Sequence, residues 1–178
     1  DTVRRQRQMC IRDSLAAAEY DGETIDLEVH VDGAASPASI EGHDDAVDVA
    51  RGFAWPHGRY DVVARRENAG PTRHRFESYT PQRCEVVAFF EDDVVVARFW
   101  HRWLLMSDST SGADVAGFTF QRHWLSPGAY LREAQNGPHE SKVIGPFAHA
   151  WRSEYWAQFL DWVQQESPPA EVPGHSFS

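Results

Sequence analysis

The sequence contains few cysteines and no long hydrophobic run. Two cysteines in 178 residues are too few for a disulfide-based scaffold or for a cysteine-rich zinc site. No run of about 18 apolar residues is present, which excludes a membrane-spanning helix of the usual length. The GxSxG elbow, the Walker phosphate loop, the GxGxxG fingerprint and zincin spacing are also missing. These absences leave no motif-defined enzyme class, no metal and no cofactor to predict.

Acidic side chains outnumber basic ones. There are 27 aspartate and glutamate residues against 17 lysine and arginine residues, which gives a net charge of −10 at pH 7. Such a charge opposes general binding to nucleic acid and to anionic membranes. We therefore predict a soluble, cytoplasmic protein with no nucleic-acid partner and no membrane partner.

The first fourteen residues differ from the rest of the chain. Residues 1–14 show neither helical nor strand periodicity, lack the apolar core of a signal peptide, and resemble translated sequencing-adapter sequence. A basic N-terminal arm is the alternative. Its arginines would be Arg4, Arg5, Arg7 and Arg12. We predict a non-native or disordered segment at 1–14, a single domain at 15–165 and a disordered tail at 166–178.

The pattern of apolar residues predicts a series of strands between two helices. Alternation of apolar and polar residues predicts a strand over 24–32, and an amphipathic stretch predicts a helix over 40–54. A second helix is predicted to open at Gly145-Pro146, because proline is common in the first helical turn. The strands expected between them are 59–66, 73–79, 83–90, 94–106, 115–125 and 129–133.

This order of elements predicts an α+β fold. A curved antiparallel sheet would wrap around a long C-terminal helix, as in the START/Bet v1-like helix-grip fold. A cone-shaped NTF2-like fold is the alternative, and both folds enclose a cavity between sheet and helix. The predicted C-terminal helix has one broad aromatic face, formed by Phe147, Trp151, Tyr155, Phe159, Trp162 and Val163.

A hypothetical pairing of three strands gathers polar residues on an apolar face. With a two-residue turn at Asp92-Asp93 and closure of the next polar loop, Cys84, His101 and Arg122 fall on that face. A buried arginine must find an anion or several acceptors, and burial keeps an imidazole neutral. The aromatic residues predicted to surround them are Phe99, Trp103, Phe118, Phe120, Trp124, Trp151 and Tyr155.

These residues predict a binding site for a small apolar molecule. If the protein is an enzyme, we expect cofactor-free acid–base chemistry such as cyclisation, dehydration or isomerisation. His101 would then transfer protons, and Arg122 would hold a carboxylate or enolate. A purely structural interpretation stays open, with His101 as a satisfied core histidine, Arg122 reaching solvent and Cys84 as inert packing.

An acidic strand face supports a second hypothesis, a non-catalytic protein-interaction module. Asp26, Glu28, His30 and Asp32 share one face of the strand over 24–32. With a third ligand, Glu28 and His30 would suit a divalent metal, but a solvated acidic stripe is the structure we expect. Such a stripe would attract a basic protein partner, and a homodimer is a further alternative.

Overall fold

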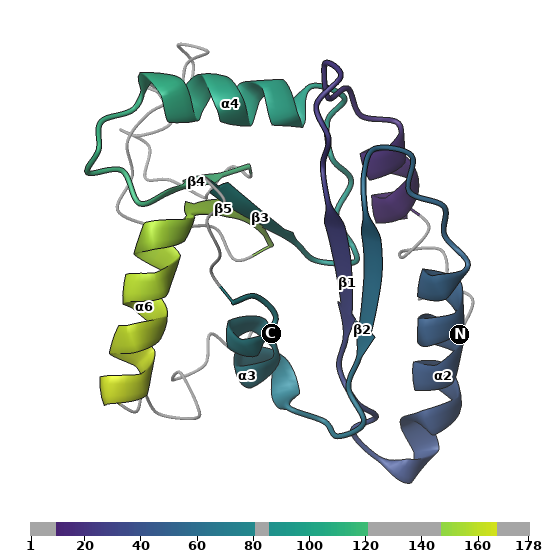
Figure 1. Cartoon of the computed structure of the whole chain (residues 1–178). Coiled ribbons are helices and arrows are strands. Elements are labelled where there is room, and N and C mark those ends of the chain that lie inside the picture. Colours follow the sequence, from purple (N-terminus) through teal and green to yellow (C-terminus); the bar gives the residue numbers. More distant parts are fainter. Residues whose placement is uncertain (1–9, 81–85, 121–146, 167–178) are drawn as a thin grey trace, which may run out of the picture.

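The described part of the chain is a mixed α/β structure with two small sheets (Figure 1). The structure is a computed structural model that describes residues 10–80, 86–120 and 147–166. The prediction of an α+β protein with an antiparallel sheet is confirmed in this broad form. Within these ranges the strands do not close into a barrel.

The first sheet is a parallel pair joined by a helical crossover. It is built from β1 (Leu27–Val31), η1 (Pro37–Ser39), α2 (Ile40–Arg51) and β2 (Tyr60–Ala64). The buried face of α2 carries Ala46, Val47 and Ala50, and the helix contacts both strands. The two strands and the helix predicted for this region are confirmed to within a few residues at each end.

The second sheet is antiparallel. Its strands are β3 (Val86–Phe90), β4 (Gly117–Thr119) and β5 (Ala148–Arg152), and β5 lies between the other two. Ala150 is paired with Ala88 on one side and with Phe118 on the other. Gly117 is required here, because a Cβ atom at this position would collide with the carbonyl oxygen of Ala150.

Helices cover both faces of the second sheet. In Figure 1, α4 (Trp100–Thr110) lies over one face, and α3 (Gly70–Glu77) and α6 (Ser153–Glu166) lie toward the other. Successive residues of β5 point to opposite faces, so Ala150 packs with the α4 side and Trp151 with the α6 side.

The strand predicted over 94–106 is wrong. Residues 94–97 have no regular structure, and α4 begins at Trp100. Apolar residues are so frequent in this segment that both the strand and the helix period fit it. The buried positions Trp100, Leu104 and Ser107 follow the helical interval of three to four residues. The three-strand pairing built on this segment is therefore wrong as well, because β3 pairs with β5.

The strand predicted over 73–79 is also wrong, because α3 occupies most of it. The break in the pattern at Asn68–Pro71 is correctly located, but Pro71 lies in the first turn of a helix instead of leading into a strand. The first turn of α3 is capped by the carboxylate of Asp32, which is distant in the sequence. No local pattern reveals that cap.

The C-terminal helix begins later than predicted. It starts at Ser153, because the residues before it form β5. Trp151 therefore lies on a strand, and Phe147 precedes that strand. Residues 145–146, the strand predicted over 129–133 and the tail at 167–178 lie outside the described residues.

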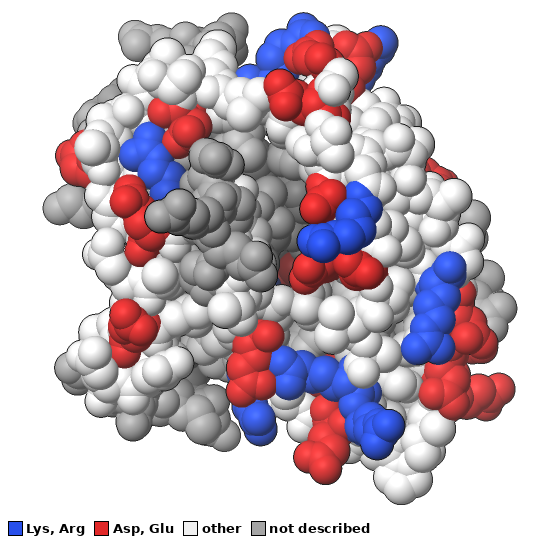
Figure 2. Space-filling model, in the orientation of Figure 1, with Lys and Arg blue, Asp and Glu red and all other residues white. Residues whose placement is uncertain are grey.

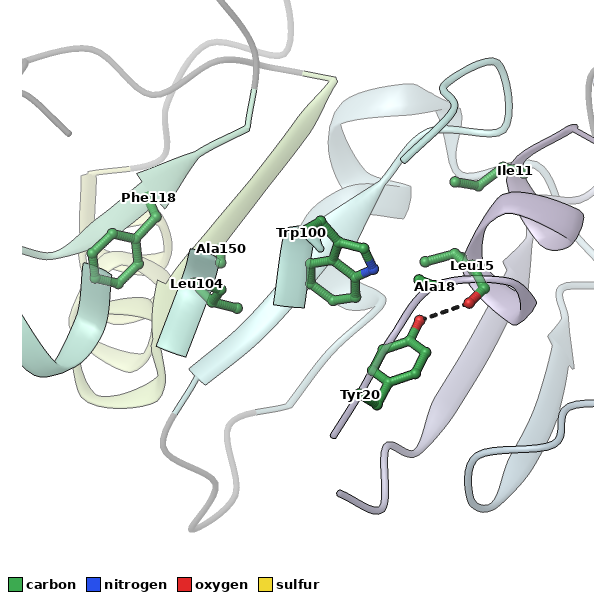
Figure 3. Packing of buried hydrophobic residues seen from close by; sticks show 8 residues of the cluster. All are labelled: Ile11, Leu15, Ala18, Tyr20, Trp100, Leu104, Phe118 and Ala150. Carbon is green, nitrogen blue, oxygen red and sulfur yellow. Dashed lines mark hydrogen bonds between the residues drawn. The ribbon is translucent and has the colours of Figure 1, made fainter. Parts of the chain in front are cut away.

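One buried cluster connects the two sheets (Figure 3). Its members are Ile11, Leu15, Ala18, Tyr20, Trp100, Leu104, Phe118 and Ala150. Residues 10–16 are helical, and Ile11 and Leu15 bring them into this cluster. This packing differs from the expectation that 1–14 lies apart from the domain, while residues 1–9 fall outside the described part.

Candidate functional site

His101 is a buried histidine on the inner face of α4. Its relative exposure is 6%, and its ring centroid lies 5.3 Å from that of Tyr20 and 5.6 Å from that of Trp100. The Nδ1 atom is enclosed and has no hydrogen-bond partner. Burial lowers the pKa of His101, although Glu23 and Asp21 act in the opposite direction. The imidazole is therefore mainly neutral at pH 7.

Tyr20 is the centre of an aromatic group beside His101. Its ring lies 5.7 Å from Trp55, 4.5 Å from His57 and 5.9 Å from Trp100, measured between centroids. Its hydroxyl donates a hydrogen bond of 2.9 Å to the Leu15 carbonyl (Figure 3). Burial raises the pKa of Tyr20, and the nearby Trp100 side chain partly opposes this. The uncharged rings of Tyr20 and Trp100 thus lie against a neutral imidazole.

The loop over residues 19–26 covers this group at the start of α4. The Glu19 backbone N–H donates to the Arg98 carbonyl at 2.8 Å, and the side chains of the same two residues form an ion pair. Arg102 Nε donates to Asp21 at 2.9 Å. Both arginines are more than half exposed, so these ion pairs add little stability. Beneath these surface contacts, Tyr20 anchors the loop by packing against Trp100 and His101 in the buried cluster.

The other end of α4 is held by hydrogen bonds from β5. The Arg152 guanidinium, on β5, donates to the Asp108 carboxylate at 2.7 Å and to the carbonyls of Gly112 and Val115 at 2.8 and 2.9 Å. Its side chain is largely buried. The first turn of α4, where His101 lies, is held instead by the packing of Trp100 in the buried cluster.

The structure brings together only some of the predicted site residues. His101 is buried among aromatic rings as expected, but it reaches them from a helix and not from a strand. Arg122, Cys84 and Trp124 lie outside the described residues, so the structure assigns them no place in the site.

The predicted aromatic residues fall into different surroundings. Phe118 is buried in the main cluster, and Trp103 and Phe120 pack against it with their rings 5.6 Å apart. Phe99 is 46% exposed, and its ring contacts the guanidinium groups of two neighbouring arginines. Three of these four aromatics therefore belong to the core beneath α4.

Trp151 and Tyr155 lie on the other side of the second sheet. Trp151 packs against Trp156 and Phe159 of α6. The Tyr155 hydroxyl donates to the Ala113 carbonyl at 2.6 Å. These contacts are structural, and they separate both side chains from the group around His101.

Tyr20, Trp55 and His57 were not predicted as site residues from the sequence. They lie in segments without regular secondary structure, so neither the helix period nor the strand period marks them. Only the three-dimensional approach of the 19–26 loop and the segment before β2 to α4 brings them together.

A second group of titratable side chains lies at the carboxyl end of β1. The Asp32 carboxylate accepts hydrogen bonds from the backbone N–H groups of Gly33, Ala69 and Gly70 at 2.8 to 2.9 Å. His74 Nδ1 lies 3.8 Å from it. Burial raises the pKa of the Asp32 carboxyl, but the hydrogen bonds lower it further, so it lies below its ordinary value. The oxygens of the Asp32 carboxylate are thus occupied in capping α3.

The other acidic residues of this strand are paired locally. Asp26 accepts a hydrogen bond of 3.0 Å from the Arg59 backbone N–H, and Glu28 lies 3.1 Å from His30 Nε2. Across the described ranges, no three His, Cys, Asp or Glu side chains are grouped as a metal site would require. Figure 2 shows basic side chains beside acidic ones over the visible face of the molecule.

Comparisons with known proteins gave no relative. No protein-family model matches the chain, and no curated protein or solved structure matches it. In the part of the chain that is described, none of the helices has the length and apolar character needed to cross a membrane.

Proposed function

We propose that the protein binds a small apolar molecule beside His101. The observation that carries this proposal is a neutral, buried imidazole with an unpartnered Nδ1, set among the rings of Tyr20 and Trp100. Buried polar atoms are nearly always hydrogen-bonded, so one without a partner requires an explanation. Nε1 of the neighbouring Trp100 is a second enclosed atom without a partner. Aromatic walls with a few polar groups are typical of sites for apolar ligands.

The loop over residues 19–26 supplies a route for the ligand. It covers His101 through the buried ring of Tyr20, and exposed ion pairs tie its surface to the start of α4. Its turn at Asp21 and Gly22 has positive φ angles of 53° and 84°. Opening this loop would move Tyr20 out of the buried cluster, so ligand entry requires a local opening that includes this ring.

A catalytic form of the proposal keeps the same site. His101 would transfer a proton in a cofactor-free cyclisation, dehydration or isomerisation, since its lowered pKa favours the neutral form that acts as a base. Arg122 remains our prediction for the group that stabilises a developing anion. Enclosure by a helix-grip or NTF2-like arrangement and a cytoplasmic location also remain predictions.

The interaction-module hypothesis receives less support. It needs the acidic residues in and beside β1 to be available to a partner, but Asp32 caps α3 and Asp26 is bonded to Arg59. We therefore retain ligand binding as the proposal.

Native mass spectrometry of the full chain tests it, together with titration of 2-naphthol followed by calorimetry. We expect either a small molecule that is released on denaturation or saturable binding of the probe. In His101→Leu, affinity should fall by about tenfold, the usual effect of losing one hydrogen bond in a buried site.

The matched control is His43→Leu. His43 lies on α2, where it contacts the neighbouring Asp44, and it has no part in the aromatic group. Its affinity should equal that of the wild type. The proposal is wrong if the wild-type chain retains no ligand and shows no saturable binding, or if folded His101→Leu binds as tightly as the wild type.

A further inference from the structure

We infer that the ligand carries a hydroxyl or N–H group on an aromatic body and donates this hydrogen to Nδ1 of His101. This inference rests on the proposed function and names the class of molecule, a phenol-like or indole-like compound. It follows from the position of the proton on the imidazole and from the groups around it.

The enclosed nitrogen of His101 is an acceptor. A neutral imidazole carries one proton, and the hydrogen bonds available to the two nitrogens determine which of them holds it. Nδ1 has no protein acceptor to receive a proton, whereas Nε2 is not an enclosed, unpartnered atom. The proton is therefore retained on Nε2, and Nδ1 presents a lone pair to the aromatic surroundings.

The charges near His101 select against an anion. The carboxylates of Asp21 and Glu23 are close enough to raise the pKa of His101, so their field opposes a negative ligand. Arg102, the basic side chain nearest to them on α4, is already paired with Asp21. A carboxylate facing Nδ1 would meet a lone pair as well as this field.

The rings around His101 favour a flat, apolar body. Tyr20 and Trp100 both present ring atoms to the imidazole, and Trp55 packs edge-on against Tyr20. Aromatic rings prefer edge-to-face or offset contacts with other rings. A phenol-like molecule satisfies both requirements, because its ring packs against aromatic walls and its hydroxyl supplies the missing donor.

The test compares two probes of similar size on the full chain at pH 7. 2-Naphthol has a hydroxyl donor, and 2-fluoronaphthalene has no donor but is more apolar. We expect 2-naphthol to bind at least about tenfold more tightly, since an unsatisfied buried acceptor strongly penalises the analogue without a donor. The preference should disappear in His101→Leu.

A nitrogen-15 NMR spectrum of the histidine rings provides a readout that does not depend on the variant. The Nδ1 signal of His101 should show an unprotonated nitrogen and should shift with 2-naphthol but not with 2-fluoronaphthalene. A protonated Nδ1 would overturn the inference, even if the variant failed to fold.

The outcomes separate the two proposals. Equal affinity for the two probes, or a preference that survives in His101→Leu, contradicts the phenol-like ligand but leaves apolar binding intact. Absence of binding for both probes contradicts the proposed function and this inference together. A tenfold preference that depends on His101 supports both.

Discussion

Replacing Trp156 by alanine should lower the free energy of unfolding by about 3 to 5 kcal/mol, the usual cost of removing a buried tryptophan. Trp156 is 2% exposed and contacts the rings of Phe89, Trp151 and Phe159 at 4.8 to 5.6 Å. Its indole N–H also donates to the Tyr79 carbonyl at 3.3 Å. Urea unfolding followed by far-ultraviolet circular dichroism measures the change.

Trp162→Ala on the same helix is the control. Its side chain is 50% exposed and contacts the ring of Phe159 at 6.0 Å. The substitution should change stability by about 1 kcal/mol or less, because little apolar area returns to water. Similar losses for the two variants would show that α6 does not pack against the second sheet as the structure describes.

The local pattern of apolar residues predicted an element correctly where its sequence has one clear period. Strict alternation in the segment around Leu27 indicates a strand, and the spacing of Ala46, Val47 and Ala50 indicates a helix. Both are confirmed. The pattern failed around Trp100, where apolar residues occupy so many positions that both periods fit, and around Pro71, where a distant carboxylate caps a helix.

Of the candidate site, only the central residue, His101, could be predicted from the sequence. His101 stands out as a polar group within an aromatic segment, and burial of such a group could be inferred from its neighbours. Its actual companions, Tyr20 and Trp55, come from irregular segments. Their approach to α4 depends on the tertiary fold, so no spacing rule predicts it.

The strand β5 also could not be predicted from local spacing alone. Its residues have the spacing of a helix face together with α6, and a strand of five residues is too short to impose its own period on that pattern. Pairing with β3 and β4 on both sides decides the outcome, because each backbone N–H and C=O group of a central strand then has a partner.

Replacing Asp32 by alanine should lower the free energy of unfolding by about 3 kcal/mol, because several donors lose one shared acceptor. These are the backbone N–H groups of Gly33, Ala69 and Gly70 and the side-chain amide of Asn68. Hydrogen exchange should show the loss directly, with faster exchange at Ala69 and Gly70 than at the amides of β3. Unchanged exchange at these two amides would mean that Asp32 does not cap α3.

The pH dependence of this effect has a defined sign. The pKa of the Asp32 carboxyl is lower in the folded chain than in the unfolded one, so its contribution is complete above about pH 4, the usual value for aspartate. This contribution is lost as the pH falls through the pKa of Asp32 in the folded chain. The difference in free energy of unfolding between the wild type and Asp32→Ala should therefore become smaller in that pH range. Asp61→Ala, which removes an exposed ion pair with Arg59, is the matched control and should lower stability only slightly.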